Sequence, residues 1–271
     1  MHLAEPLLAT WKAHLGLRFE ERNARTVLAE RRLDGPLVVQ KTFHPEGDAV
    51  CHAIVVHPPG GIAGGDELAL TCESGPGAHA LLTTPGAGKW YRSSGALASQ
   101  RLDFSVAGTV EWLPRETIVF DGALARLETH VELGESGRYI GWEVACLGRS
   151  ASGERFTRGE VRLASRISRV GRPVWVERGR IDGGGELLRS PAGLGGHNVF
   201  GTLVATLETD DASLVAACRE HAVVTRLPGL VIARYLGDSA EEAFERFTRV
   251  WSLLRPAVAG REAVAPRIWS T

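Results

Sequence analysis

The chain has 271 residues, of which 44% are hydrophobic, so it is long enough to bury a sizeable core. Its 31 basic and 32 acidic residues nearly cancel and leave a formal net charge of -1. No run of five or six like charges is present, so the charge pattern supports neither a nucleic-acid-binding protein nor attachment to an anionic membrane.

The first 210 residues have the pattern of a strand-rich protein. Short runs of Val, Ile, Leu and Thr alternate with polar residues, and Gly, Pro and Asp stand between them. Strand-like runs without intervening helices predict an all-β fold and leave a sandwich, a barrel and a solenoid open. The clearest runs lie at residues 37–43, 53–56, 68–72, 80–84, 102–106, 128–133 and 173–178. In the last of these, strict alternation places Val174 and Val176 on one face, opposite Trp175 and Glu177.

Two helices are predicted near the C-terminus. Ser239 and Glu242 form a capping box, and apolar residues then follow helical spacing up to Pro256, where we expect this helix to end. A weaker helix begins near Asp210 or Asp211, and residues 230–236 between the two helices form a strand. Because no long linker divides the sequence, we predict one domain over residues 1–271.

The cysteines and the N-terminal residues favour a cytoplasmic protein. The four cysteines are widely spaced among apolar or small neighbours and contain no C-x-x-C, which is typical of reduced, buried thiols. The first six residues lack a charged segment followed by an apolar one, so we expect no signal peptide. No apolar stretch approaches the length of about 18 to 20 residues that spans a bilayer.

No catalytic signature stands out. The GAGK at 86–89 lacks the first glycine of a phosphate loop, where Thr83 stands, and has Trp90 in place of the following Ser or Thr. The segment 57–66, HPPGGIAGGD, predicts a rigid loop that either has a purely structural role or brings the backbone close to another surface. His57 and Asp66 at its ends are weak evidence for a metal pair, and His52 points to the opposite strand face from His57.

Several segments, in this order, resemble the signature blocks of the UreD (UreH) family of urease accessory proteins. Each block is moderately specific, and together they span nearly the whole chain. Trp90 is a mild departure, because an aromatic such as Phe is common at that place. The blocks are HPPGGIAGGD at 57–66, TTPGAGKWYRS at 83–93, EWLPRETIVFDGA at 111–123, WVER at 175–178 followed by Asp182-Gly183, and PRIWST at 266–271.

The resemblance implies a β-helix-like fold with two helices and a non-catalytic function. Members of this family bind UreF, which binds the GTPase UreG, and the assembly docks on apo-urease and supports nickel insertion. The resemblance also implies an internal water-filled passage for transient Ni²⁺ and no permanently bound cofactor. Such a passage needs oxygen groups that bind the ion weakly, because tight sites would trap it.

On this resemblance, Asp66 and Glu177 are the candidate passage-lining metal ligands. The structural alternative for Asp66 is a turn residue that hydrogen-bonds nearby backbone. For Glu177 it is an outward carboxylate paired with Arg178 or Arg180. The remaining family-motif residues are His57, Gly60, Gly61, Gly64, Gly65, Lys89, Tyr91, Arg92 and Asp121.

Within that set, Lys89 and Arg92 favour a salt bridge or a partner contact over a metal role, and Asp121 can simply make a turn. Trp90, with Tyr91 and Arg92, has the composition of a partner-binding surface, as has the C-terminal segment with Arg267 and Trp269. For the tryptophans burial is the favoured alternative. Two other functions stay open: a small-molecule enzyme on a β scaffold using Asp66 and His57, and a plain β-rich interaction module.

Overall fold

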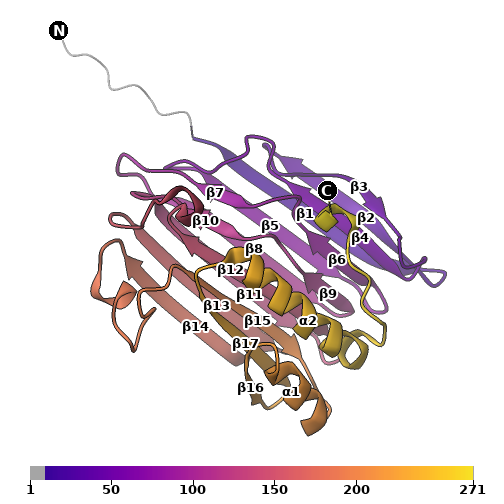
Figure 1. Ribbon diagram of the computed structural model, residues 1–271. Helices are drawn as coiled ribbons and strands as arrows, with labels where there is room; N and C mark the ends of the chain where they lie inside the picture. The colour runs from indigo at the N-terminus through magenta and orange to yellow at the C-terminus, as the bar shows by residue number, and fades with distance from the viewer. Residues whose placement is uncertain (1–9, 271) are drawn as a thin grey trace.

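The computed structural model describes residues 10–270, so the N-terminal residues for which we expected no signal peptide lie outside the described chain. The secondary structure is mostly β, as the sequence predicts (Figure 1). The helices are α1 (Ala212–Arg219) and α2 (Ala240–Ala259), with short 3₁₀ turns η1 (Ser150–Ser152), η2 (Glu186–Leu188) and η3 (Arg267–Ser270). The strands are β1 (Lys12–Arg22), β2 (Arg25–Asp34), β3 (Val38–Phe43), β4 (Val50–Val56), β5 (Glu67–Ser74), β6 (His79–Thr83), β7 (Gly88–Trp90), β8 (Ala98–Val106), β9 (Thr109–Trp112), β10 (Thr117–Val119), β11 (Leu124–Leu133), β12 (Arg138–Leu147), β13 (Glu160–Arg169), β14 (Arg172–Asp182), β15 (Val199–Thr206), β16 (Val223–Leu227) and β17 (Leu230–Gly237).

The middle of the chain winds as a parallel coil between two sheets. Successive long strands alternate between the sheets, so that β5, β8, β11 and β13 pair in parallel in one sheet, and β4, β6, β9 and β12 in the other. The short strands β7 and β10 pair with each other, and β10 also pairs with β12. This winding confirms the β-helix-like prediction.

Antiparallel strands close both ends of the coil. Sheet A, ordered β14-β13-β11-β8-β5-β1-β2, ends in the pairs β1–β2 and β13–β14. Sheet B, ordered β16-β17-β15-β12-β9-β6-β4-β3, ends in β3–β4 on one side and in β15, β17 and β16 on the other. Strands β2, β14, β3 and β16 are therefore the edges of the two sheets.

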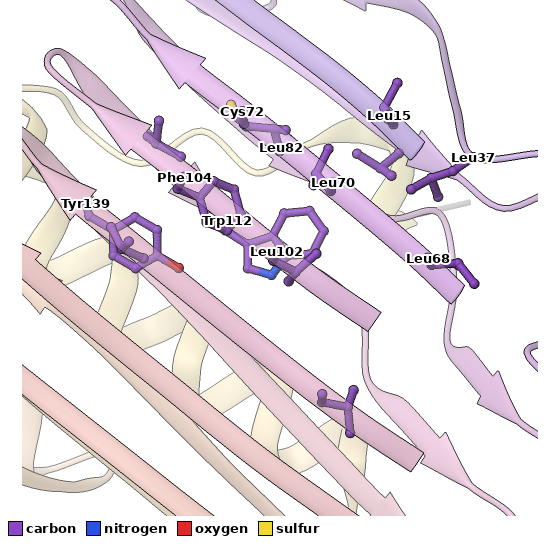
Figure 2. Packing of buried hydrophobic residues seen from close by; sticks show 14 of the residues in the cluster. Leu15, Leu37, Leu68, Leu70, Cys72, Leu82, Leu102, Phe104, Trp112 and Tyr139 are labelled. Carbon is purple, nitrogen blue, oxygen red and sulfur yellow. The ribbon is translucent and has the colours of Figure 1, made fainter. Parts of the chain in front are cut away.

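A layer of apolar side chains packs between the sheets. Along β5, Leu68, Leu70 and Cys72 are buried, while the residues between them are more exposed, as expected when every second residue faces inward. Figure 2 shows Phe104 of β8 and Trp112 of β9, which belong to opposite sheets, and their ring centroids lie 5.8 Å apart. This core holds the two sheets together along the coil.

Helices α1 and α2 cover the other face of sheet B and create a second core (Figure 1). Asp211 caps α1 by accepting hydrogen bonds from the backbone N–H groups of Ser213 and Leu214, both at 3.0 Å. Ser239 caps α2 in the same way at Glu242, which confirms both predicted helix starts. No helix of residues 10–270 covers the outer face of sheet A.

The structure corrects the end that we predicted for the second helix. Pro256 lies inside α2, which continues to Ala259 and ends at Gly260 with a positive φ of 68°. A proline inside a helix costs about 3 kcal/mol because it removes one N–H donor. Burial of Val258 in the second core and of Arg255 among acidic partners offsets that cost. The single domain over 1–271 stays a prediction.

Candidate functional site

Two adjoining cavities lie inside the protein between the sheets. The Glu177 cavity, named after its acidic residue at β14, has a volume of about 140 Å³. The His57 cavity, beside the glycine-rich loop, has a volume of about 340 Å³. Thr117, Glu143 and Val144 line both of them, so the two spaces meet at these residues.

Glu143 is the acidic group at this junction, and the sequence analysis did not single it out. It stands on β12, and the Thr129 hydroxyl of β11 donates a hydrogen bond to its carboxylate. Burial raises the pKa of Glu143, the Thr129 hydrogen bond opposes that effect, and the nearby Glu177 carboxylate raises the pKa further. Glu143 therefore holds its proton more strongly than an exposed glutamate.

Glu177 faces the interior, on the strand face opposite Val174 and Val176. Val174 and Val176 on the same strand are 38% and 50% exposed and point outward, whereas Glu177 lines the Glu177 cavity. Its carboxylate pairs with Arg234 of β17 and not with the neighbouring Arg178 or Arg180 that the structural alternative named. Glu177 thus lines an interior cavity, and its role as a passage-lining metal ligand stays a prediction.

Two polar atoms are buried beside the His57 cavity without a hydrogen-bond partner among residues 10–270: Nε2 of His57 and Nε1 of Trp112. Burial lowers the pKa of His57, and the charge of Asp66 opposes this effect. Buried polar groups without protein partners are normally satisfied by ordered water. This cavity is therefore suited to hold water.

Asp66 has the structural role that the sequence analysis set beside its metal role. One carboxylate oxygen accepts a hydrogen bond from the backbone N–H of Trp11 and the other from that of Ala63, both at 2.8 Å. The side chain is buried and is not among the residues that line the two cavities. It fixes the glycine-rich loop, so a passage-lining role for Asp66, or a role as an enzymatic base with His57, has no support from this geometry.

The four glycines of that loop are required for two different reasons. Gly60 and Gly65 have positive φ angles of 77° and 93°, which side chains rarely tolerate. A Cβ on Gly61 would lie 2.0 Å from the ring of Tyr91, and one on Gly64 would lie 2.3 Å from the Ser93 hydroxyl. The loop thus packs tightly on the chain's own second signature block.

The motif residues Lys89, Tyr91 and Arg92 are exposed near this loop, whereas Asp121 is buried. The side-chain NH2 of Arg92 is 3.8 Å from the carboxylate of Asp121, which confirms a salt bridge as one expectation for that arginine. Burial of Asp121 would raise its pKa, but hydrogen bonds from Thr157 and Arg158 lower it to about 2. Asp121 therefore anchors residues 157–158 as well as making a turn.

The tryptophans predicted for partner binding point inward. Trp90 is 1% exposed in the core between the sheets, so its ring is not available on the surface, and the favoured alternative of burial holds. Trp269 packs against Trp142, Phe244 and Trp251 in the second core, and its Nε1 donates to the Thr83 hydroxyl at 2.9 Å. Of Trp90, Trp269 and Arg267, only Arg267 is exposed.

A buried charged cluster beneath α2 was also missed by the sequence analysis. Arg255 is fully buried and donates to the carboxylates of Glu46 and Glu111, with the closest contacts at 2.6 and 2.9 Å. Nε2 of His52 lies 2.6 Å from Glu46, and Nε2 of His79 lies 2.6 Å from Glu111. These residues come from four separate segments, so no local spacing could have indicated the cluster.

Other expectations concern metal ligands, thiols and membranes. Within residues 10–270, no group of three or more His, Cys, Asp or Glu side chains is placed to hold a metal ion. The four cysteines are free and buried. None of the helices in the described part of the chain is both long and apolar enough to cross a bilayer.

Comparison with known proteins agrees with the sequence resemblance. The family model described as "UreD urease accessory protein" matches residues 12–270. The chain is 54% identical to the urease accessory protein UreD of Azoarcus sp. (strain BH72) over 279 residues, covering 100% of this chain and 97% of that protein. It is 54% identical to the protein of the same name from Dechloromonas aromatica, covering 97% and 95% of the two chains. These matches extend over nearly the whole fold described above, and the chain belongs to the UreD family of urease accessory proteins.

Proposed function

We propose that the chain is a maturation scaffold that binds apo-urease and the UreF–UreG complex and supports nickel insertion into the urease active site. The observation that carries this proposal is the pair of interior cavities that meet at Glu143. A transfer path for Ni²⁺ needs polar groups inside the protein and must lack a closed ligand set that would retain the ion.

The side chains along these cavities suit a weakly held cation. Oxygen atoms come from Glu143, Glu177, Thr117 and Thr129, which line the space between the sheets. Carboxylates and hydroxyls are hard ligands, and only two of these four groups can carry a charge. We infer that nickel is a transient cargo and that the protein has no permanently bound cofactor.

Partner contacts in this proposal use exposed groups near the His57 cavity. Tyr91 is 42% exposed and lies edge-on against Phe120, with ring centroids 5.0 Å apart. The exposed Pro58, Pro59 and Arg92 are on the same loop and on the strand end that packs against it. Aromatic and arginine side chains of this kind are enriched at interfaces. Together with free, buried cysteines, this favours a protein that works with partners in the cytoplasm and not as an enzyme.

The proposal is tested by urease activation in a heterologous host that carries the urease operon. The gene for this chain is intact, deleted, or replaced by the Glu177→Ala or Asp66→Ala variant, and nickel is measured in the purified urease. We expect nickel-poor, inactive urease after deletion, and a lower nickel content with Glu177→Ala. Asp66→Ala is expected to act through loss of folded protein. Fully metallated urease in the deletion strain would contradict the proposed function.

A further inference from the structure

The mouth of the Glu177 cavity is crossed by an ion pair that joins the two sheets. Glu177 stands on β14, the edge strand of sheet A, and Arg234 stands on β17 of sheet B. Arg234 also donates to the Thr202 hydroxyl of β15 at 2.9 Å, which fixes its position. The two side chains are 34% and 43% exposed, so the pair lies where the cavity reaches solvent.

The ion pair leaves no net charge at this mouth. The carboxylate of Glu177 is neutralised by the guanidinium of Arg234. A divalent cation that enters here gains this carboxylate as a ligand only if Glu177 exchanges its guanidinium partner for the ion.

We infer that Arg234 is a positioning residue that gates the cavity by keeping Glu177 paired, and that this competition keeps the affinity for a divalent cation low. The inference rests on the proposed function, in which the cation is cargo. Arg234 sets how long Glu177 can hold the ion, and it re-forms the pair when the ion leaves. Glu143, which lies near enough to interact with Glu177, is the next acidic group inward.

The experiment measures Ni²⁺ affinity of the full chain by competition with a chromophoric chelator. The variants are Arg234→Gln, Glu177→Gln, the double variant and Arg234→Lys. Arg234→Gln should bind Ni²⁺ at least about tenfold more tightly, because it frees a carboxylate and removes a positive charge. Glu177→Gln and the double variant should lack that gain, since the carboxylate that holds the ion is absent. Arg234→Lys should stay near the affinity of the unaltered chain.

Arg149→Gln is the matched control. Arg149 and Glu154 form an exposed pair whose side chains are 49% and 21% exposed, and neither residue lines the two cavities. Its loss frees one carboxylate elsewhere on the surface and should leave Ni²⁺ affinity unchanged. Thermal unfolding of each variant identifies a loss of fold.

Two outcomes overturn the gate. One is a folded Arg234→Gln variant whose affinity equals or falls below that of the unaltered chain. The other is a gain that persists in the double variant, because the ion would then not be held by Glu177. Neither outcome depends on urease activation. The gate can therefore fail while deletion still yields nickel-poor urease, and the proposed function can fail while the affinity pattern holds.

Discussion

Two carboxyl groups on opposite faces of sheet B, the buried Glu111 and the half-buried Glu143, behave in opposite ways. Glu111, on the face beneath α2, accepts hydrogen bonds from Arg255, His79 and Trp251. Burial would raise the pKa of Glu111, but its contacts with His79 and Arg255 lower it. Glu143, on the cavity face, has only Thr129 as a hydrogen-bond donor among the described residues, and its pKa is raised.

The comparison shows that partners, and not burial alone, decide what a buried acid does. Glu111 and Glu46 share Arg255 as a counter-charge, so the cluster fixes α2 on the sheet. Glu143 lacks such partners, and its carboxyl group lines both cavities. The first arrangement is structural, and the second places a carboxyl group on the path that we propose for the ion.

The largest effect is expected from Arg255→Met, which should destabilise the fold by about 3–5 kcal/mol. It leaves Glu46 and Glu111 buried without their common counter-charge. Denaturant unfolding measures the loss. Arg101→Met, which breaks the pair with Asp103 on the open face of sheet A, is the control and should cost about 0–1 kcal/mol. Equal losses in the two variants would show that the cluster does not lock α2.

The second largest effect on stability is expected from acid, which should weaken the same cluster. Burial would raise the pKa of Glu46, but hydrogen bonds from His52 and Arg255 lower it from 4.5 to about 2. Because the folded state holds this proton less strongly, the stabilisation is complete above pH 4.5 and is lost as pH falls toward 2. The loss is on the order of 3 kcal/mol. Unfolding measured across this range should show a flatter pH dependence for Glu46→Gln, and an unchanged dependence would exclude Glu46 as its source.

Trp251→Phe should have a smaller effect on the stability of the same buried cluster. It removes the indole N–H that donates to Glu111 and keeps most of the ring in the second core. We expect a loss of about 1–3 kcal/mol in the free energy of unfolding, which is typical for one lost donor to a charged, buried acceptor. Combining it with Glu111→Gln should give less than the sum of the two losses.

Glu143→Gln should have the smallest effect on stability, within about 1 kcal/mol, because the amide resembles the protonated acid that burial favours. Nickel in urease matured with this variant should nevertheless fall, since the amide cannot exchange a proton for the ion. Nickel content and unfolding are measured on the same preparations. A variant that is strongly destabilised would place Glu143 with Glu111 as a structural acid, and normal nickel loading would remove it from the path.

Much of the local structure followed from the sequence alone. Period-two alternation located the main strands and placed Glu177 on the face opposite Val174 and Val176, because side chains of a strand alternate between its faces. The capping residues Asp211 and Ser239 located the helix starts, since they satisfy N–H groups within the same short segment. The ordered signature blocks led to the family.

Only the tertiary structure decided which charged groups meet. Arg234 and Glu177 are 57 residues apart, and Arg255 is 144 residues from Glu111 and 209 from Glu46. Tertiary packing also decided that α2 continues past Pro256. It likewise decided that Trp90 is buried between the two sheets. Sequence periodicity predicts only on which face of its own strand or helix a side chain lies. The partner across the coil is set by strand order and by the layer that covers each sheet.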